Sequence, residues 1–489
     1  MKKVTDITYF NNQKLDFYLP ENEGFKTIIY FHGGGMVEGN KWDAWTLGEH
    51  FSSKGICLVS VEYSLYPNAK FPQYLIEAAH AVKYVFDHIK EYGGSTNDIY
   101  ISGQSAGAWL TLMLCFNDEF LRSAGVDKSM IKGWISDSAQ PTSHFNVMKY
   151  EKGIDPSLQR IDEFAPLYYV NKDTKFSNLL LLYYENDMPC RLEQNQLLFK
   201  TLKQLVPTQR VEAKLCPGSH CAGSSILVDG EYPYLNIVLD YIKRIEESKK
   251  INVLMIGNSF SVDVGEFTHD LSLGTKKEIE LGVLYIGGCN LEHHVDCMNR
   301  NAKEYEWFIN GMSSGQFISL EDALKDRNWD YISLQQVSGL GGLKETYYPY
   351  IHQLIDYIKK YQKDTEIILH ETWAYPHYSD HPDFVHYGNN TKTMHLALKK
   401  TYTEIAKELG IKIIIPSGDI IESAREKFNI CLNRDGFHLN ETGRYLASLG
   451  FVYTLCGEIN ELYMPLEKGL GKEDCIKFKE FLRENIKQA

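Results

Sequence analysis

Residues 99–116 read Ile-Tyr-Ile-Ser-Gly-Gln-Ser-Ala-Gly-Ala-Trp-Leu-Thr-Leu-Met-Leu-Cys-Phe, and this stretch decides the fold of the first half of the chain. Its beginning, Ile99–Gly103, is typical of a buried strand, and Ala106–Phe116 is typical of an apolar helix. Glycines on both sides of Ser105 permit a sharp turn that lifts the serine hydroxyl clear of the sheet. The stretch therefore predicts a serine nucleophile at a strand-to-helix turn.

Short apolar runs alternate with segments of helical period on both sides of this turn. Buried strands that alternate with helices favour a mostly parallel sheet covered on both faces. The predicted helices are 73–92, 106–116 and 232–245, and the predicted strands are 27–32, 56–63, 99–103, 133–137, 179–184 and 211–215.

A glycine run, His32-Gly33-Gly34-Gly35, follows the predicted strand 27–32. Glycines there let backbone amides approach a substrate carbonyl oxygen and stabilise the charge that develops on it. A serine also needs a base, and the base needs an orienting carboxylate. His220 lies in a turn after the strand 211–215, and Asp187 ends the strand 179–184, with Glu185 as a competitor for the acid.

These ordered elements resemble the α/β-hydrolase family, and more narrowly its carboxylesterases and lipases with an HGGG loop. The resemblance covers nearly all of residues 1–246, which we expect to form the first domain. It implies that Ser105 is the nucleophile, His220 the general base and acid, and Asp187 the orienting carboxylate. It also implies an oxyanion hole made of the amides of Gly33, Gly34 and Ala106.

The charged run Glu246–Lys250 is the predicted domain boundary, because it has no apolar spacing. A second alternation of strands and helices begins after it, and residues 251–489 are expected to form another α/β sandwich. The predicted sheet has five strands, at 251–257, 279–286, 331–335, 366–369 and 411–415.

Gly257-Asn258-Ser259-Phe260-Ser261 follows the strand 251–256 and resembles the first block of the SGNH (GDSL-like) hydrolases, whose sandwich is flavodoxin-like. Far downstream, Asp435-Gly436-Phe437-His438 matches their D-x-x-H block. The resemblance implies Ser259 as nucleophile, His438 as base and Asp435 as orienter. Gly288, which follows a strand, and Gln336, at the place of the family's Asn, are the expected oxyanion donors.

Histidines and an acid also follow strands in this half, at His293, His294, His370 and Glu371. Their spacing matches no metalloenzyme motif, so substrate contact or packing is the preferred interpretation and no metal is expected.

Composition limits the partners. A net charge of -13 disfavours nucleic acid, whose phosphates need clustered Lys and Arg. The apolar runs are shorter than the about 20 residues of a spanning helix, which disfavours a membrane protein. Ten scattered cysteines without C-x-x-C pairs suggest reduced thiols and a cytoplasmic protein. The sequence leaves a homo-oligomer open.

Both resembled families cleave esters through an acyl-enzyme and need no cofactor. Two unrelated esterase folds on one chain suit a substrate that carries acetyl groups at positions no single pocket reaches. We therefore expect a bifunctional serine esterase that acts on acetylated oligosaccharides, such as those of xylan or mannan, or on small esters. The alternative is a single-site carboxylesterase, lipase or peptidase-like first domain with a sugar-binding, non-hydrolytic second domain.

Overall fold

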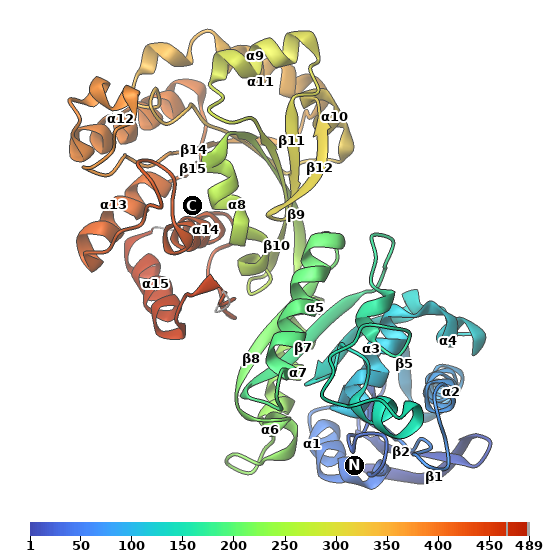
Figure 1. The fold of residues 1–489 in the computed structure, drawn as a ribbon. Coiled ribbons are helices and arrows are strands. Elements are labelled where there is room, and N and C mark those ends of the chain that lie inside the picture. The colour runs from blue at the N-terminus through green and yellow to red at the C-terminus, as the bar shows by residue number, and fades with distance from the viewer. Residues whose placement is uncertain (466–467, 487–489) are drawn as a thin grey trace. The chain divides into compact units, whose positions relative to one another are not determined.

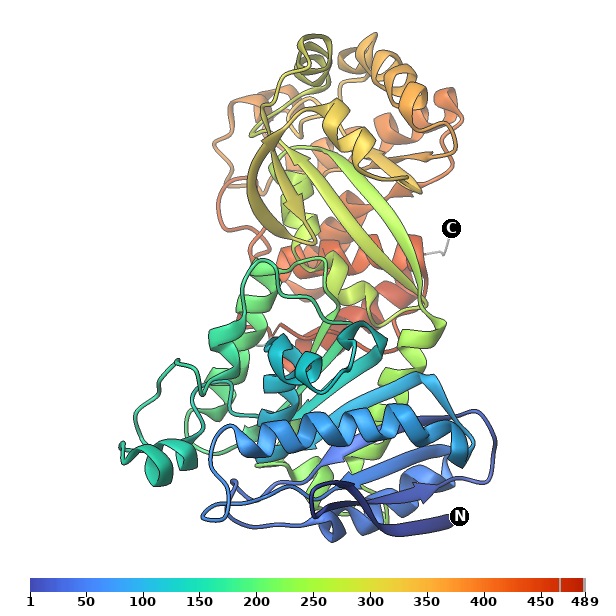
Figure 2. The same cartoon turned by 90° about the vertical axis from the view of Figure 1, so that its right-hand side faces the viewer.

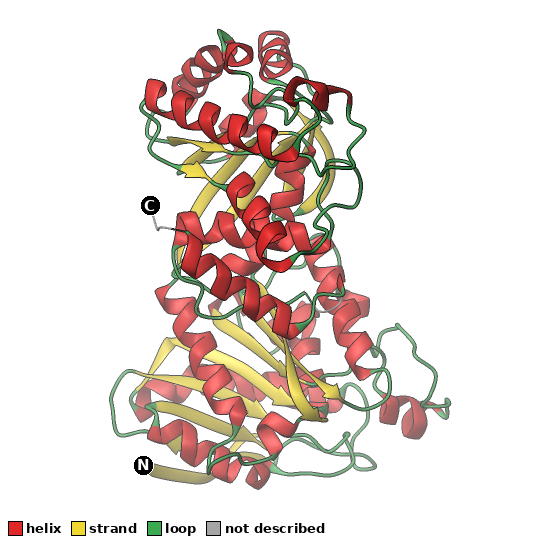
Figure 3. Cartoon of the chain, turned by 90° about the vertical axis from the view of Figure 1, so that its left-hand side faces the viewer, coloured by secondary structure: helices red, strands yellow, loops and turns green. Residues whose placement is uncertain are grey.

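The computed structural model describes residues 1–465 and 468–486, which form two compact units, Met1–Ile245 and Glu246–Ala489 (Figure 1). Helices and strands alternate along both units, and the helices of each unit cover its sheet (Figure 3). The predicted α/β class with mostly parallel sheets is therefore confirmed. Among the described helices, none is long and apolar enough to cross a membrane.

The first unit is built on an eight-stranded sheet in the order β1-β2-β4-β3-β5-β6-β7-β8. From β4 to β8 all neighbours are parallel, whereas β1 and β2 form an antiparallel hairpin at one edge. The strands are β1 (Lys2–Phe10), β2 (Gln13–Leu19), β3 (Phe25–Phe31), β4 (Ile56–Val61), β5 (Gly94–Gln104), β6 (Ile131–Asp137), β7 (Asn178–Asn186) and β8 (Val211–Ser219).

Successive residues of a strand point to opposite faces of the sheet. Because both kinds of position are buried in the central strands, helices cover both faces. Ile28 and Tyr30 of β3 belong to an apolar core with residues of α1 and α7, and α2 and α3 pack against each other (Figure 2). The helices are α1 (Trp45–Ser53), α2 (Gln73–His88), α3 (Ala106–Phe116), α4 (Asp118–Ser123), α5 (Arg191–Leu205), α6 (Ala222–Ser225) and α7 (Pro233–Glu247).

The second unit contains a seven-stranded sheet in the order β12-β11-β10-β9-β13-β14-β15 within the described residues. The strands are β9 (Lys249–Gly257), β10 (Lys277–Tyr285), β11 (Tyr305–Ile309), β12 (Met312–Ile318), β13 (Tyr331–Leu334), β14 (Glu366–His370) and β15 (Ile414–Ile415). The prediction of five strands was therefore wrong: β11 and β12 form an added antiparallel hairpin beside β10. Polar and exposed residues make up most of β12, so no apolar pattern marked it.

The helices of the second unit pack against its sheet to form the core, and α8 packs against both β10 and α14. The helices are α8 (Ser259–Ser272), α9 (Leu291–Arg300), α10 (Leu320–Asp326), α11 (Tyr350–Tyr361), α12 (Thr391–Leu409), α13 (Ser417–Phe428), α14 (Glu441–Cys456) and α15 (Lys472–Asn485).

The charged run Glu246–Lys250 is not a free linker. Helix α7 continues to Glu247, and β9 begins at Lys249, so one residue separates the two elements. Lys249 already pairs with Lys277 in the parallel ladder of β9 and β10. The charges lie on exposed positions of regular structure, which explains why they resembled a linker in the sequence.

Candidate active sites

Ser105 lies at the turn between β5 and α3 in a backbone conformation that L-residues rarely adopt, with φ 53° and ψ -112°. Two glycines make this turn fit. A Cβ on Gly103 would lie 2.2 Å from the carbonyl carbon of Gly107, and a Cβ on Gly107 would lie 2.0 Å from the carbonyl oxygen of Phe31. Only glycine therefore lets β5, α3 and β3 approach so closely, and the turn presents Ser105 at the carboxyl end of the strand.

Ser105, His220 and Asp187 form a continuous hydrogen-bonded chain. The Oγ of Ser105 lies 2.8 Å from Nε2 of His220, and Nδ1 of His220 lies 2.5 Å from Oδ1 of Asp187. The carboxylate comes from the loop after β7 and the imidazole from the loop after β8, two neighbouring parallel strands. Glu185, the competing acid, is exposed and contacts neither partner in the described structure.

Ser138 is a further member of this chain that the sequence analysis did not identify. Its hydroxyl donates to Oδ2 of Asp187 and lies 2.9 Å from Nδ1 of His220. Burial alone raises the pKa of Asp187, but the hydrogen bonds from His220 and Ser138 outweigh it and hold that pKa below its usual value. The carboxylate thus stays ionised next to the imidazole. The signal for Ser138 was its position directly after β6, one residue beyond Asp137.

The glycine loop lies next to the serine. A Cβ on Gly33 would be 3.5 Å from Cβ of Ser105, and Gly34 has a φ of 105°. Within the described residues, no hydrogen bond uses the amides of Gly33, Gly34 or Ala106, so these three donors are available to a ligand. From the segment after β6, Nδ2 of Asn146 donates to the carbonyl of Gly35 at 2.8 Å, which fixes the loop.

A second buried carboxylate supports the histidine loop. Tyr184 and Ser224 both donate to Asp137, the first at 2.8 Å, and the thiol of Cys221, next to His220, lies 3.6 Å from the Asp137 carbonyl. Burial raises the pKa of Asp137 to about 6, although the hydrogen bonds from Ser224 and Tyr184 oppose the shift. The network anchors the residues that follow His220.

In the second unit, Ser259 is the first residue of α8, and Asn258 caps this helix by accepting from the amide of Phe260. The Oγ of Ser259 lies 2.9 Å from Nε2 of His438, whose Nδ1 lies 2.8 Å from Oδ2 of Asp435. A second serine, histidine and aspartate therefore meet in hydrogen-bonding order, although 179 positions separate Ser259 from His438.

Asp435 and His438 belong to one tight turn. Oδ1 of Asp435 accepts from the amides of Phe437 and His438, at 2.9 and 2.6 Å. Burial raises the pKa of Asp435, but these backbone hydrogen bonds and the one from the imidazole outweigh it and lower that pKa. The Asp435 side chain is 42% exposed, whereas that of Asp187 is 1% exposed. Water therefore screens the second carboxylate far more than the first.

A buried polar network supports Ser259 from below. Asn258 donates to the carbonyl of Cys289 at 3.0 Å and accepts from Nε2 of Gln335 at 2.8 Å. Oε1 of Gln335 accepts from Ser261 and lies 2.7 Å from Nδ1 of His370. Asn258, the residue before Ser259, thus connects the start of α8 to the loop that contains Gly288. Gly288 has a φ of 64°, and a Cβ there would meet no atom within 4 Å.

Gln336 does not fit the expected oxyanion role. Its Nε2 donates to the carbonyl of Thr346 at 2.9 Å and lies 3.2 Å from the Thr346 hydroxyl, while its Oε1 accepts from the amide of Leu291 at 3.0 Å. Both amide hydrogens are thereby committed to Thr346, because the longer arm of Gln reaches past the position of an Asn. We assign Gln336 to the packing of loops around β13.

The remaining polar residues that the sequence analysis noted are distributed between core and surface. His294 and His370 are fully buried, and burial lowers the pKa of each to about 3. His294 lies 3.0 Å from the hydroxyl of Tyr305, and His370 lies 3.0 Å from that of Ser417. None of the ten cysteines, all of which lie in the described residues, forms a disulfide; Cys216 and Cys221 lie on either side of His220, while Cys190 and Cys431 are exposed.

Comparison with known families divides the chain in two. The BD-FAE family model matches residues 15–202, and the model of a domain of unknown function, DUF4886, matches residues 252–466. A crystal structure of a DUF4886 family protein from Bacteroides uniformis is 33% identical, with a TM-score of 0.44 over 49% of this chain and 98% of that chain.

Curated relatives match part of the chain. A probable isoprenylcysteine alpha-carbonyl methylesterase of Arabidopsis thaliana is 36% identical over 97 residues, which are 19% of this chain and 20% of that protein. An acetyl esterase of Salmonella typhi is 32% identical over 113 residues, which are 22% of this chain and 35% of that protein. The chain thus spans about a fifth to a third of the length of these two relatives.

Proposed function

We propose that this chain, a two-domain esterase-type hydrolase with a BD-FAE domain followed by a DUF4886 domain, removes acetyl groups from carbohydrate esters at two independent sites. The observation that carries the proposal is the pair of hydrogen-bonded triads, Ser105–His220–Asp187 and Ser259–His438–Asp435. Each contains a nucleophile, a base and an orienting carboxylate in the order that acyl transfer needs.

At the first site, Oγ of Ser105 attacks the ester carbonyl carbon while its proton passes to Nε2 of His220. The amides of Gly33, Gly34 and Ala106 donate to the oxygen that becomes negatively charged. The C–O bond to the sugar then breaks, and the imidazolium returns the proton to the leaving alkoxide. Water, deprotonated by the same histidine, releases acetate from the serine.

The second site performs the same steps with Ser259 and His438, and with Gln336 set aside we propose the amides of Gly288 and Ser259 as its oxyanion donors. No side-chain donor replaces Gln336 there in our assignment. Since loss of one oxyanion donor lowers kcat about 10²- to 10³-fold, we expect the second site to be the slower one on activated esters.

The acetyl specificity draws support from the acetyl esterase of Salmonella typhi, to which 22% of this chain is similar. Ester hydrolysis at both centres needs no metal or redox group in this scheme. An oligosaccharide with several acetyl groups is a substrate on which two sites of different shape would each remove different groups.

A single-site alternative is favoured by one observation on the second domain. The Asp435 side chain is 42% exposed and Gln336 is committed to Thr346, so that centre has a more strongly screened carboxylate and fewer oxyanion donors. In this alternative the first domain is a short-chain carboxylesterase, and the second binds sugars without cleaving them.

Acetate release from acetylated xylan and mannan oligosaccharides distinguishes the two. The intact protein, Ser105→Ala, Ser259→Ala and the double variant are compared, with residual acetyl positions mapped by NMR. Ser53→Ala and Ser313→Ala, at exposed serines of the two domains, serve as controls. We expect each single variant to leave a different set of acetyl groups and the double variant to be inactive. If Ser259→Ala equals the wild type on every substrate, the single-site alternative holds.

A further inference from the structure

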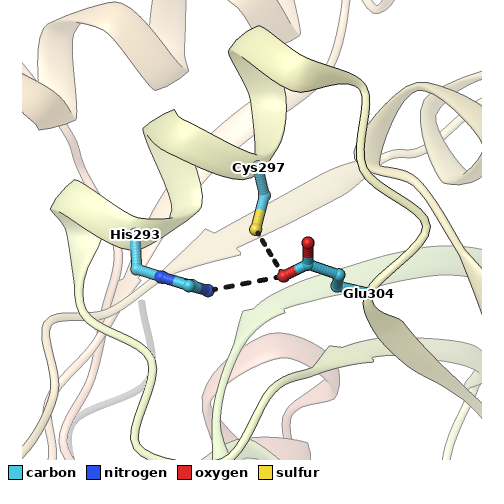
Figure 4. A group of neighbouring side chains, drawn as sticks. All are labelled: His293, Cys297 and Glu304. Carbon is cyan, nitrogen blue, oxygen red and sulfur yellow. Dashed lines mark hydrogen bonds and ion pairs between the residues drawn. The ribbon is translucent and has the colours of Figure 1, made fainter.

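Three metal-ligand side chains that belong to neither triad converge at one side of α9. Figure 4 shows His293, Cys297 and Glu304 pointing toward one another. His293 and Cys297 lie four residues apart, on the same face of the helix, and Glu304 belongs to the segment that leads into β11. The spacing His-x3-Cys followed by Glu seven residues later was visible in the sequence, where only His293 was considered.

The distances between the three ligand atoms approach those of a metal site. Oε2 of Glu304 lies 3.8 Å from Nε2 of His293 and 3.7 Å from Sγ of Cys297, and all three atoms lie within 4.8 Å of one another. Zinc bonds of about 2.0 Å to nitrogen or oxygen and about 2.3 Å to sulfur place tetrahedral ligands about 3.3 to 3.5 Å apart. The carboxylate oxygen of Glu304 needs to approach the imidazole by about 0.5 Å and the thiol by about 0.2 Å. The imidazole and the thiol lie within 4.8 Å of each other and need to approach by at most about 1.3 Å.

Burial differs among the three ligands in a way that suits a bound ion. Cys297 is buried, with 1% of its surface exposed, while the side chains of His293 and Glu304 are 45% and 44% exposed. The thiol thus forms the floor of the cluster, and the imidazole and carboxylate stand at its open side. An ion can enter from solvent and retain a water molecule as its fourth ligand.

Arg300 holds the carboxylate in position from the outside. It donates to Oε1 of Glu304 at 2.9 Å, which leaves Oε2 directed at His293 and Cys297, and it also binds Asp296 at 2.7 Å. Such outer partners orient ligands in metal sites. Counted with a Cys297 thiolate, the two carboxylates and Arg300 leave two negative charges, which a divalent cation neutralises.

We propose that His293, Cys297 and Glu304 bind a zinc ion, with water as the fourth ligand. An imidazole, a thiolate and a carboxylate form a set that suits zinc and disfavours magnesium and calcium, which prefer oxygen ligands. The ion links α9 to the start of β11. Helix α9 directly follows the loop that contains Gly288, so the bound ion would also hold the helix next to that loop in place. The proposal is independent of which esters the chain hydrolyses.

A second group, Glu371, His395 and Asp419, also brings ligand atoms together, but it is a weaker candidate. Lys399 already supplies a cation to Asp419 at 2.9 Å. Burial raises the pKa of Glu371 well above its usual value, which makes this carboxyl a poorer metal ligand than that of Glu304. The group provides a control for the test.

Cobalt(II) reports on the site, because a thiolate ligand gives it a charge-transfer absorption band. The full chain, freed of metal with a chelator, is titrated with Co²⁺ and then with Zn²⁺ in competition. We expect one equivalent of Co²⁺ with a thiolate band that Zn²⁺ removes. Cys297→Ser should abolish the band, and His293→Ala should weaken Zn²⁺ binding at least as much as the about 10- to 100-fold that loss of an outer partner costs.

Cys289→Ser and Glu371→Gln are the matched controls, since they remove a nearby thiol and a member of the other group, and both should keep the band. His293 is half exposed, so its replacement tests the ligand without disturbing the core; circular dichroism checks the fold of Cys297→Ser. A wild-type chain without a thiolate band, or a band that survives Cys297→Ser, would overturn the proposal.

Discussion

The two triad carboxylates differ in exposure, and this difference predicts unequal costs for replacing them. The side chain of Asp187 is 1% exposed and that of Asp435 is 42% exposed. A carboxylate stabilises an imidazolium 4 Å away by about 4 kcal/mol at an effective dielectric constant near 20, and by about 1 kcal/mol in water. Asp187→Asn should therefore raise its barrier by about 3 kcal/mol more than Asp435→Asn raises its own, which is a difference of about 100-fold in kcat.

The assay measures kcat for a short-chain aryl ester in two single-site backgrounds, with Ser259→Ala for Asp187→Asn and Ser105→Ala for Asp435→Asn. In Asp435→Asn the side-chain oxygen can still accept the hydrogen bonds that two backbone amides donate to Asp435, so the turn is retained. Glu185→Gln is the control and should leave kcat unchanged. Equal losses at the two sites, or a larger loss for Asp435→Asn, would refute the argument from exposure.

Three other predictions follow from contacts described above. Gly107→Ala places a methyl group 2.0 Å from the carbonyl oxygen of Phe31, so α3 must shift by about 1 Å. A misplacement of that size should lower kcat at the first site about 100-fold. An unchanged kcat would contradict the close approach of α3 and β3. Gln336→Ala leaves the carbonyl of Thr346 without its partner and should lower stability by about 1 to 3 kcal/mol in urea unfolding. The kcat of Gln336→Ala at the second site should fall by less than the about 10²-fold that loss of an oxyanion donor causes. A larger fall would show that Gln336 is an oxyanion donor after all. The pKa of Asp137 is raised from 3.8 to about 6, so the folded state binds this proton more tightly and the carboxyl contributes stability below pH about 4 that is lost as the pH rises to about 6. This loss is about 3 kcal/mol, and Asp137→Asn should lack it when unfolding is compared at pH 4 and pH 7; parallel pH curves for the two proteins would count against the shift.

Apolar periodicity was sufficient to predict the central strands. Helix α3 was predicted at its observed bounds, Ala106–Phe116, because every position in it is buried and apolar or small. The edge strands β1 and β12, and β11 next to β12, escaped prediction because one or both of their faces meet water, so their residues are mixed or polar. Neighbouring strands, rather than their own composition, determine these elements.

The members of the candidate sites differed in how well the sequence indicated them. Ser105 directly follows β5 and Ser259 lies two residues beyond the end of β9, each within a distinctive motif, so local pattern was informative. Ser138 has no motif and reaches Asp187 only because β6 and β7 are adjacent in the sheet. For Gln336, position after β13 suggested a role that its hydrogen bonds to Thr346 do not support. Side-chain direction depends on tertiary partners that spacing does not specify.

The short turn from Asp435 to His438 has a consequence for how the two centres diverge over evolutionary time. The proposed acid and base of the second domain, Asp435 and His438, are encoded within four consecutive codons, and their mutual geometry depends on backbone amides of the same turn. A single deletion there removes both functions in one event. In the first domain, Asp187 and His220 lie 33 positions apart on separate loops, so an insertion between them can lengthen α5 or its flanking turns while each residue keeps its own strand. Homologues of the second domain should therefore lose acid and base together, whereas homologues of the first should lose them one at a time.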